Sequence, residues 1–195
     1  MRQRIWAVVL LGSVLVAPSA WASTWKIDQE HTTVAFKVRH LFSKVQGEFK
    51  QFEGTFDYEP GKPEAWKANA TIQASSIDTN VAERDKHLRS KDFFDVDQYP
   101  TLTFTSTGVR DVSQTGAKLD GLLTIHGVQK PVTLDLEVHG AGKDPWGNVR
   151  SGFTAKTTIN RKDFGLTWNM AVETGQLLVG EEAEIILEVE GIAAE

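Results

Sequence analysis

Apolar and polar residues alternate along most of the chain after its first 22 residues. Val34, Phe36 and Val38 fall on one side of an extended chain, and the same alternation recurs over 119–125 and 132–138. Because successive side chains of a strand point to opposite faces, this period of two predicts half-buried antiparallel strands. Further strands are expected at 25–28, 47–58, 68–74, 101–107, 149–159 and 184–191, which gives eight to nine strands in all.

Two connections between these strands have patterns of their own. Residues 125–132 are typical of a hairpin in which Gly127 supplies the conformational freedom of the turn. The one helix that the sequence predicts is 81–88, with Asp78 or Thr79 as its cap. Strands joined by short connections, with a single helix, predict one all-β domain that is either a sandwich or a closed up-and-down barrel.

The aromatic content bears on what such a barrel would contain. All ten Phe residues follow residue 22, which is more than a small, tightly packed barrel needs. An eight-stranded barrel encloses either its own side chains or one ligand. Whether the interior is filled is therefore the functional question that the strand pattern leaves open.

The first residues have the three parts of a secretory signal peptide. A basic start precedes an apolar run at 5–17, and small residues stand at Ala20 and Ala22. The apolar run is too short to span a bilayer. We therefore expect a signal peptide at 1–22, cleavage after Ala22, a single mature domain at 23–195, and export to the periplasm or secretion.

Composition excludes several classes of site. The chain has no Cys, which excludes disulfides, Cys-ligated metals and a thiol nucleophile. Its net charge is −5, and removal of Arg2 and Arg4 with the signal peptide makes it −7. We expect no nucleic-acid partner, because binding to a phosphate backbone needs clustered Lys and Arg.

The five His residues do not form a ligand pattern. His31 and His40 point to opposite faces of one strand, while His87, His126 and His139 fall in the helix, the hairpin loop and a strand end. No short-range His motif, nucleophile elbow or phosphate loop occurs. We expect neither a metal centre nor a nucleophilic catalytic site.

The stretch 84–95 carries charges of both signs beside two aromatic residues. One interpretation is a solvated helix in which Asp85 and Arg89 pair across one turn while Phe93 and Phe94 fill the core. The other is a rim over a cavity. Spacing alone favours the first interpretation.

Several sequence blocks occur in order through the whole chain after residue 24. They are Trp25–Asp28, His31–His40, Val45–Phe49, Arg84–Asp95, Tyr99-Pro100, Gly121–Val128 and Arg161–Gly165. Together these blocks resemble the YceI-like family. Thr32 stands where that family often has Ser, a change that keeps the hydroxyl group.

The resemblance implies a fold and a ligand. The fold would be an eight-stranded antiparallel lipocalin-like barrel with a short helical segment over it. The ligand would be an isoprenoid such as a polyprenyl chain or an isoprenoid quinone, or another fatty amphiphile, with no cofactor. Arg84 and His87 would approach the mouth of its tunnel. The side chains expected to line the tunnel are Phe36, Val38, Phe49, Phe56, Ile72, Phe93, Phe94, Phe104, Leu123, Ile125, Phe153 and Trp168.

Three functions are compatible with this resemblance. The first is a non-enzymatic periplasmic carrier of a long apolar lipid. The second is an enzyme acting on such a lipid, with Asp85, His87 and Asp92 as acid-base groups. The third is a stress-related accessory that delivers quinone to a membrane redox protein. Transient contact with the membrane and a homodimer are further partner hypotheses.

Overall fold

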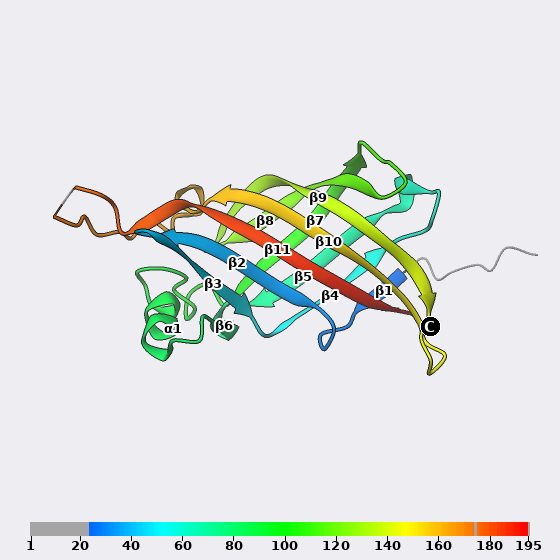
Figure 1. The fold of residues 1–195 in the computed structure, drawn as a ribbon, viewed down its shortest axis with the longest axis horizontal. Coiled ribbons are helices and arrows are strands. Elements are labelled where there is room, and N and C mark those ends of the chain that lie inside the picture. Colours follow the sequence, from blue (N-terminus) through cyan, green and yellow to red (C-terminus); the bar gives the residue numbers. More distant parts are fainter. Residues whose placement is uncertain (1–23, 174, 195) are drawn as a thin grey trace, which may run out of the picture.

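The computed structural model describes residues 24–173 and 175–194, which form one β-barrel with a short helix against one end (Figure 1). The predicted signal peptide lies outside the described residues. The strands are β1 (Thr24–Ile27), β2 (Thr33–His40), β3 (Ser43–Phe49), β4 (Phe52–Asp57), β5 (Lys67–Gln73), β6 (Ile77–Asp78), β7 (Thr101–Arg110), β8 (Gly116–Ile125), β9 (Val128–Lys143), β10 (Val149–Asn160) and β11 (Val179–Ala193). The helices are α1 (Ala82–Arg89) and the 3₁₀ turns η1 (Pro63–Ala65), η2 (Ala74–Ser76) and η3 (Arg161–Phe164).

Eight of these strands close into a ring of antiparallel neighbours. The order is β1-β4-β5-β7-β8-β9-β10-β11, and β1 pairs back onto β11. Closure leaves no free edge in this ring, which is how antiparallel sheets avoid pairing with other chains. The predicted eight-stranded antiparallel barrel with one short helix is confirmed.

Different strands form the barrel wall at its two ends. The last residues of β11 pair with β1, while its earlier residues pair with β2, so β2 and β3 continue the wall beyond β1 and β4. The outer edge of β3 carries only the short β6 within the described residues. Helix α1 lies beside β3 and β6 at this end (Figure 1), which we call the α1 end.

The core fills the barrel from the inward positions of the alternating strands. Leu119, Leu123 and Ile125 of β8 and Leu134 of β9 are buried in one cluster. The aromatic rings of that cluster include Phe49, Phe104 and Phe164, and Phe36, Phe94 and Phe153 pack against it. Burial of these side chains is the main stabilising term of the fold.

Of three local predictions, two need correction and the hairpin with Gly127 in its turn is confirmed. The predicted strand 47–58 is two strands, because the chain bends at Lys50 and Gln51 where its partner changes from β2 to β1. The helix begins and ends one residue later than predicted, and no side chain caps its first turn. The hairpin turn is two residues long, since His126 and Gly127 both have positive φ, at 52° and 73°.

No helix within 24–173 or 175–194 is long and apolar enough to cross a membrane.

Candidate ligand-binding site

The predicted tunnel residues come together inside the barrel. Eight of the twelve belong to the core cluster or pack against it: Phe36, Phe49, Ile72, Phe94, Phe104, Leu123, Ile125 and Phe153. Phe56 is buried and its ring meets the Phe153 ring edge-on at 5.0 Å. These nine side chains therefore lie in or against the core, and their contact with a ligand stays a prediction.

Three aromatic rings of the inner wall lie over glycines. A Cβ atom added at any of these glycines would come within 2.4 to 2.5 Å of the ring it faces. The absence of a side chain thus lets each ring lie along the wall instead of projecting across the barrel. The three pairs are Phe36 and Gly47, Phe104 and Gly121, and Phe56 and Gly191.

Two spaces adjoin one another at the end of the barrel away from α1. The inner space, between β4, β5, β9 and β10, has a volume of about 30 Å³ and is mostly apolar, about the size of one water molecule. The outer one, beside η1 and the shift in β7 register between Ser106 and Gly108, has a volume of about 360 Å³. Trp66 lines both. A long apolar chain can therefore enter the inner space only if neighbouring side chains move.

An aromatic cluster lies at the α1 end. The rings of His87, Phe93 and Trp168 have their centroids 4.8 to 5.1 Å apart. Phe93 is buried, while His87 and Trp168 are half-buried. Of the two predicted mouth residues, His87 thus lies against two predicted tunnel residues.

The charged side chains of α1 bind backbone groups. Arg84 donates to the hydroxyl and the carbonyl oxygen of Thr79, at 2.7 and 2.8 Å. Asp85 is buried and accepts from the Thr79 amide and hydroxyl. Arg89 donates to the carbonyls of Ser75 and Ile77. The expected Asp85 and Arg89 pair is therefore wrong, because both side chains hold the segment between β5 and α1.

The proposed acid-base trio is not assembled. His87 Nε2 lies 2.8 Å from Asp92 Oδ2, and His87 is half-buried while Asp92 is exposed to solvent. Asp85 is instead buried against Thr79. The structure therefore brings together two of the three groups that the enzyme hypothesis requires.

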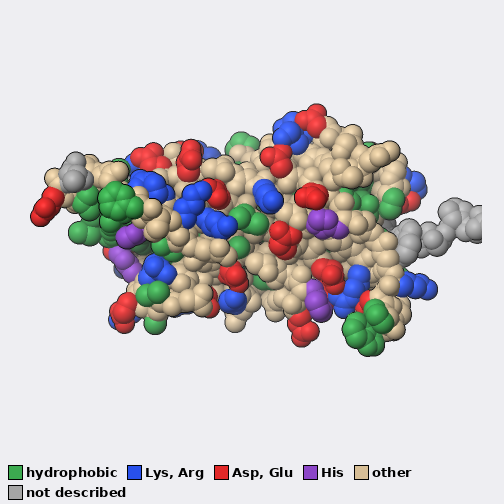
Figure 2. All heavy atoms as spheres, in the orientation of Figure 1, with side chains coloured by type: hydrophobic (Ala, Val, Ile, Leu, Met, Phe, Trp, Pro, Cys, Tyr) green, Lys and Arg blue, Asp and Glu red, His purple; other side chains and the backbone are tan. Residues whose placement is uncertain are grey.

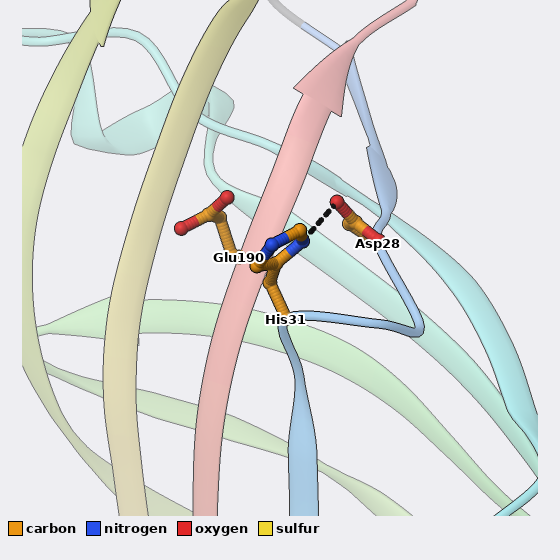
Figure 3. A group of neighbouring side chains, drawn as sticks. All are labelled: Asp28, His31 and Glu190. Carbon is orange, nitrogen blue, oxygen red and sulfur yellow. Dashed lines mark hydrogen bonds and ion pairs between the residues drawn. The ribbon is translucent and has the colours of Figure 1, made fainter. Parts of the chain in front are cut away.

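Asp28, His31 and Glu190 form a cluster that sequence separation concealed (Figure 3). Their possible metal-ligating atoms lie within 4.8 Å of one another. The Arg150 guanidinium donates to Asp28 at 2.6 Å and to Glu190 at 2.5 Å. Burial alone would raise the pKa of Asp28, but hydrogen bonds from Arg150 and His31 outweigh it and lower the pKa to about 2. Since Arg150 already supplies the positive charge, the cluster fits a charge clamp better than a metal centre.

Arg161 is a residue that the sequence reasoning did not assign to the site. It directly follows β10 and is only 4% exposed. Ala155 and Ile159 point into the core, and Arg161 is the next odd-numbered position after them. This alternation is the sequence signal that could have identified Arg161.

The chain is similar to known proteins over almost its whole length. A family model for the YceI-like domain matches residues 25–191. Protein YceI of Salmonella arizonae is 43% identical over 197 residues, with 98% of each chain covered. The solved YceI protein of Campylobacter jejuni is 32% identical with a TM-score of 0.70, covering 80% of this chain and 90% of that chain.

A more distant solved structure shares the fold. It is a polyisoprenoid binding domain from Saccharophagus degradans, implicated in plant cell wall breakdown, with 15% identity and a TM-score of 0.65. The match covers 89% of this chain and 99% of that chain. On the family match and the Salmonella relative, the chain belongs to the YceI-like family.

Proposed function

We propose that the protein is a non-enzymatic carrier that holds an isoprenoid or a similar long amphiphile inside its barrel. The observation that carries the proposal is the inner wall, where aromatic rings lie against glycines in a closed barrel with an apolar core. A relative of the same fold described as a polyisoprenoid binding domain supports this ligand class. In this proposal the carrier works in the periplasm after loss of residues 1–22.

Burial of an apolar chain is sufficient to hold such a ligand. Burying about 20 carbon atoms at roughly 0.8 kcal/mol each contributes about 16 kcal/mol. Association costs about 4 to 15 kcal/mol in lost freedom. Polar groups are then needed only to orient the headgroup, so no catalytic constellation is required.

The experiment places a bulky side chain inside the barrel. Ile185 of β11 is partly buried and packs against the core cluster, so Ile185→Trp would obstruct the interior. Glu184→Trp, one residue earlier on the outward face, is the matched control. We expect Ile185→Trp to reduce retention of radiolabelled farnesol at least tenfold, and Glu184→Trp to retain it. Equal retention by both variants, each with a native circular dichroism spectrum, would contradict the carrier proposal.

The enzyme alternative has one observation in its favour, the contact between His87 and Asp92 beside Trp168. It requires chemical conversion of the lipid. A product formed from added prenyl lipid, and lost in His87→Ala, would favour the enzyme. Stoichiometric retention without product favours the carrier.

Contact with a membrane is a further part of the proposal. Phe42, Met170 and Leu177 are exposed apolar residues in the loops of the α1 end. These loops are joined through backbone hydrogen bonds of Leu178 to Leu41 and Met170. Figure 2 shows apolar side chains gathered at that end. Such a surface suits brief contact with the lipid source, or with a membrane redox protein in the accessory role.

A further inference from the structure

Arg161 places a charged group in apolar surroundings at the α1 end. It opens η3 two residues beyond the buried Ile159, and its side chain is 4% exposed. Phe164 and Leu166, which follow it closely, both belong to the core cluster. The buried Arg161 therefore lies in a segment whose apolar residues belong to the core.

Two of the three guanidinium nitrogens have partners. Nε donates to the carbonyl of Gly180 at 2.7 Å, and Nη1 donates to the carbonyl of Leu166. Nη2 is the one buried side-chain nitrogen or oxygen in the described parts of the chain that lacks a hydrogen-bond partner. Because burying a donor of a charged group without an acceptor is costly, this atom calls for an explanation.

The neighbouring carboxylate does not supply the missing acceptor. Glu181 is exposed and is bound by Lys162 at 2.5 Å. Burial lowers the pKa of Arg161 and the charge of Glu181 partly offsets this effect. Among the described residues, Arg161 makes no ion pair. Its Nη2 thus keeps donor capacity that no neighbour uses.

The guanidinium also has a fixed position. The carbonyl of Leu166 opens the segment 166–171, which we call the strap, and Trp168 of the strap packs on His87. The Asn169 side chain ties the strap to the backbone of Val179 at 2.7 and 3.0 Å. Because Nε and Nη1 are held by the carbonyls of Gly180 and Leu166, the guanidinium is fixed and Nη2 is a preorganised donor.

We propose that Nη2 of Arg161 donates a hydrogen bond to a neutral hydroxyl or carbonyl oxygen in the headgroup of the bound amphiphile. The headgroup then lies at the α1 end and the apolar tail runs along the barrel towards Phe56 and Phe153. This assignment rests on the proposed carrier function. A neutral oxygen is sufficient, because it supplies the one acceptor that Nη2 lacks.

The test compares two ligands that differ in one oxygen. Farnesol and farnesene share a C15 prenyl skeleton, but only farnesol has a hydroxyl. Dissociation constants are measured for the natural protein and for Arg161→Met. The ratio of the two constants, compared between the proteins, cancels the different solubilities of the ligands. We expect Arg161→Met to raise the dissociation constant of farnesol at least tenfold relative to that of farnesene.

A control separates an anchor from a purely structural role. Asn169→Ala loosens the strap without touching the guanidinium, and it should change both affinities equally. If Arg161→Met also changes both equally, Arg161 only holds the strap and the proposal is wrong. If farnesene stays bound in either case, the carrier function stands. If the natural protein binds neither ligand, both the carrier function and the anchor are wrong.

A second measurement needs no variant. Side-chain ¹⁵N resonances of arginine report hydrogen bonding at the guanidinium. We expect the Arg161 resonances of the natural protein to shift on addition of farnesol and to stay unchanged with farnesene. Identical spectra with the two ligands would overturn the assignment even if Arg161→Met failed to fold.

Discussion

Single residues set the shape of the barrel interior through the glycines opposite its aromatic rings. Phe104 covers Gly121, and a methyl group there would also lie 2.8 Å from the carbonyl oxygen of Thr105. The ring therefore has no room to stay in place if a side chain is added. The glycine is required here for close approach of neighbouring atoms, since its φ is not in the left-handed region.

Gly121→Ala tests this at the residue scale. The added Cβ should displace Phe104 into the barrel, destabilise the fold by about 1 to 3 kcal/mol and reduce lipid retention. Gly108→Ala on the adjacent β7 is the control, because nothing lies within 4 Å of its Cβ position. Urea unfolding of both variants gives the comparison. Equal stability of the two would show that the ring is not held by Gly121.

The charge clamp predicts an acid dependence of stability. The pKa of Asp28 is lowered to about 2 from an ordinary value of 3.8. Its stabilising contribution is therefore present above about pH 4 and is lost as the pH falls towards 2. We expect Asp28→Asn to lower the free energy of unfolding by at most about 2 kcal/mol at pH 7.

The difference between Asp28→Asn and the natural protein should shrink below pH 4. Asp135→Asn, which removes an exposed pair with Lys118, is the control and should have little effect at any pH. Unfolding free energies measured from pH 2 to 7 provide the test. A difference that is independent of pH would rule out the clamp as its source.

At the scale of elements, α1 is held mainly by polar contacts. Leu88 packs against the core cluster, whereas Arg84, Asp85 and Arg89 bind the backbone or side chain of residues 75–79. The helix thereby fixes the segment that lies along the outer edge of β3. The helix and this segment therefore form a unit that can open separately from the rest of the barrel.

Asp85→Ala removes the acceptor of two hydrogen bonds from Thr79. Because this leaves the buried Thr79 amide unpaired, we expect a loss of roughly 1 to 3 kcal/mol. Hydrogen exchange should accelerate over 77–95 and stay unchanged in β8. Glu83→Ala, an exposed change on the same helix, should leave exchange as it is. Acceleration spread evenly over the barrel would mean that α1 is not a separate unit.

The elements were predictable where one physical signal dominated. Alternation identified most strands, since a half-buried strand needs apolar residues at every second position. It did not reveal the bend at Lys50 and Gln51, because the change of partner from β2 to β1 is a tertiary feature. The spacing of the charges in α1 predicts that they face solvent, because spacing alone does not show the backbone carbonyls nearby.

The site was predictable to a similar extent. The inward register located the lining side chains, but Arg161 was passed over although it continues that register. Asp28 and Arg150 are 122 residues apart, so only the closed ring brings them together. Contacts between distant strands depend on closure, which local pattern does not encode.

At the scale of the whole molecule, the barrel offers one apolar interior with two unlike ends. The α1 end has the strap, the aromatic cluster and exposed apolar loops, while the other end has the two spaces that meet at Trp66. The described interior is closely packed, so a carrier of this form must admit its ligand by moving side chains. The central claim is that a lipid occupies this interior.

The most direct test is mass spectrometry of an organic extract of the protein, purified from its natural host without detergent. We predict one bound prenyl lipid or similar long amphiphile per chain, greatly reduced in Ile185→Trp and retained in Glu184→Trp. Extracts free of lipid from the natural protein, or equal lipid in all three proteins, would contradict the claim.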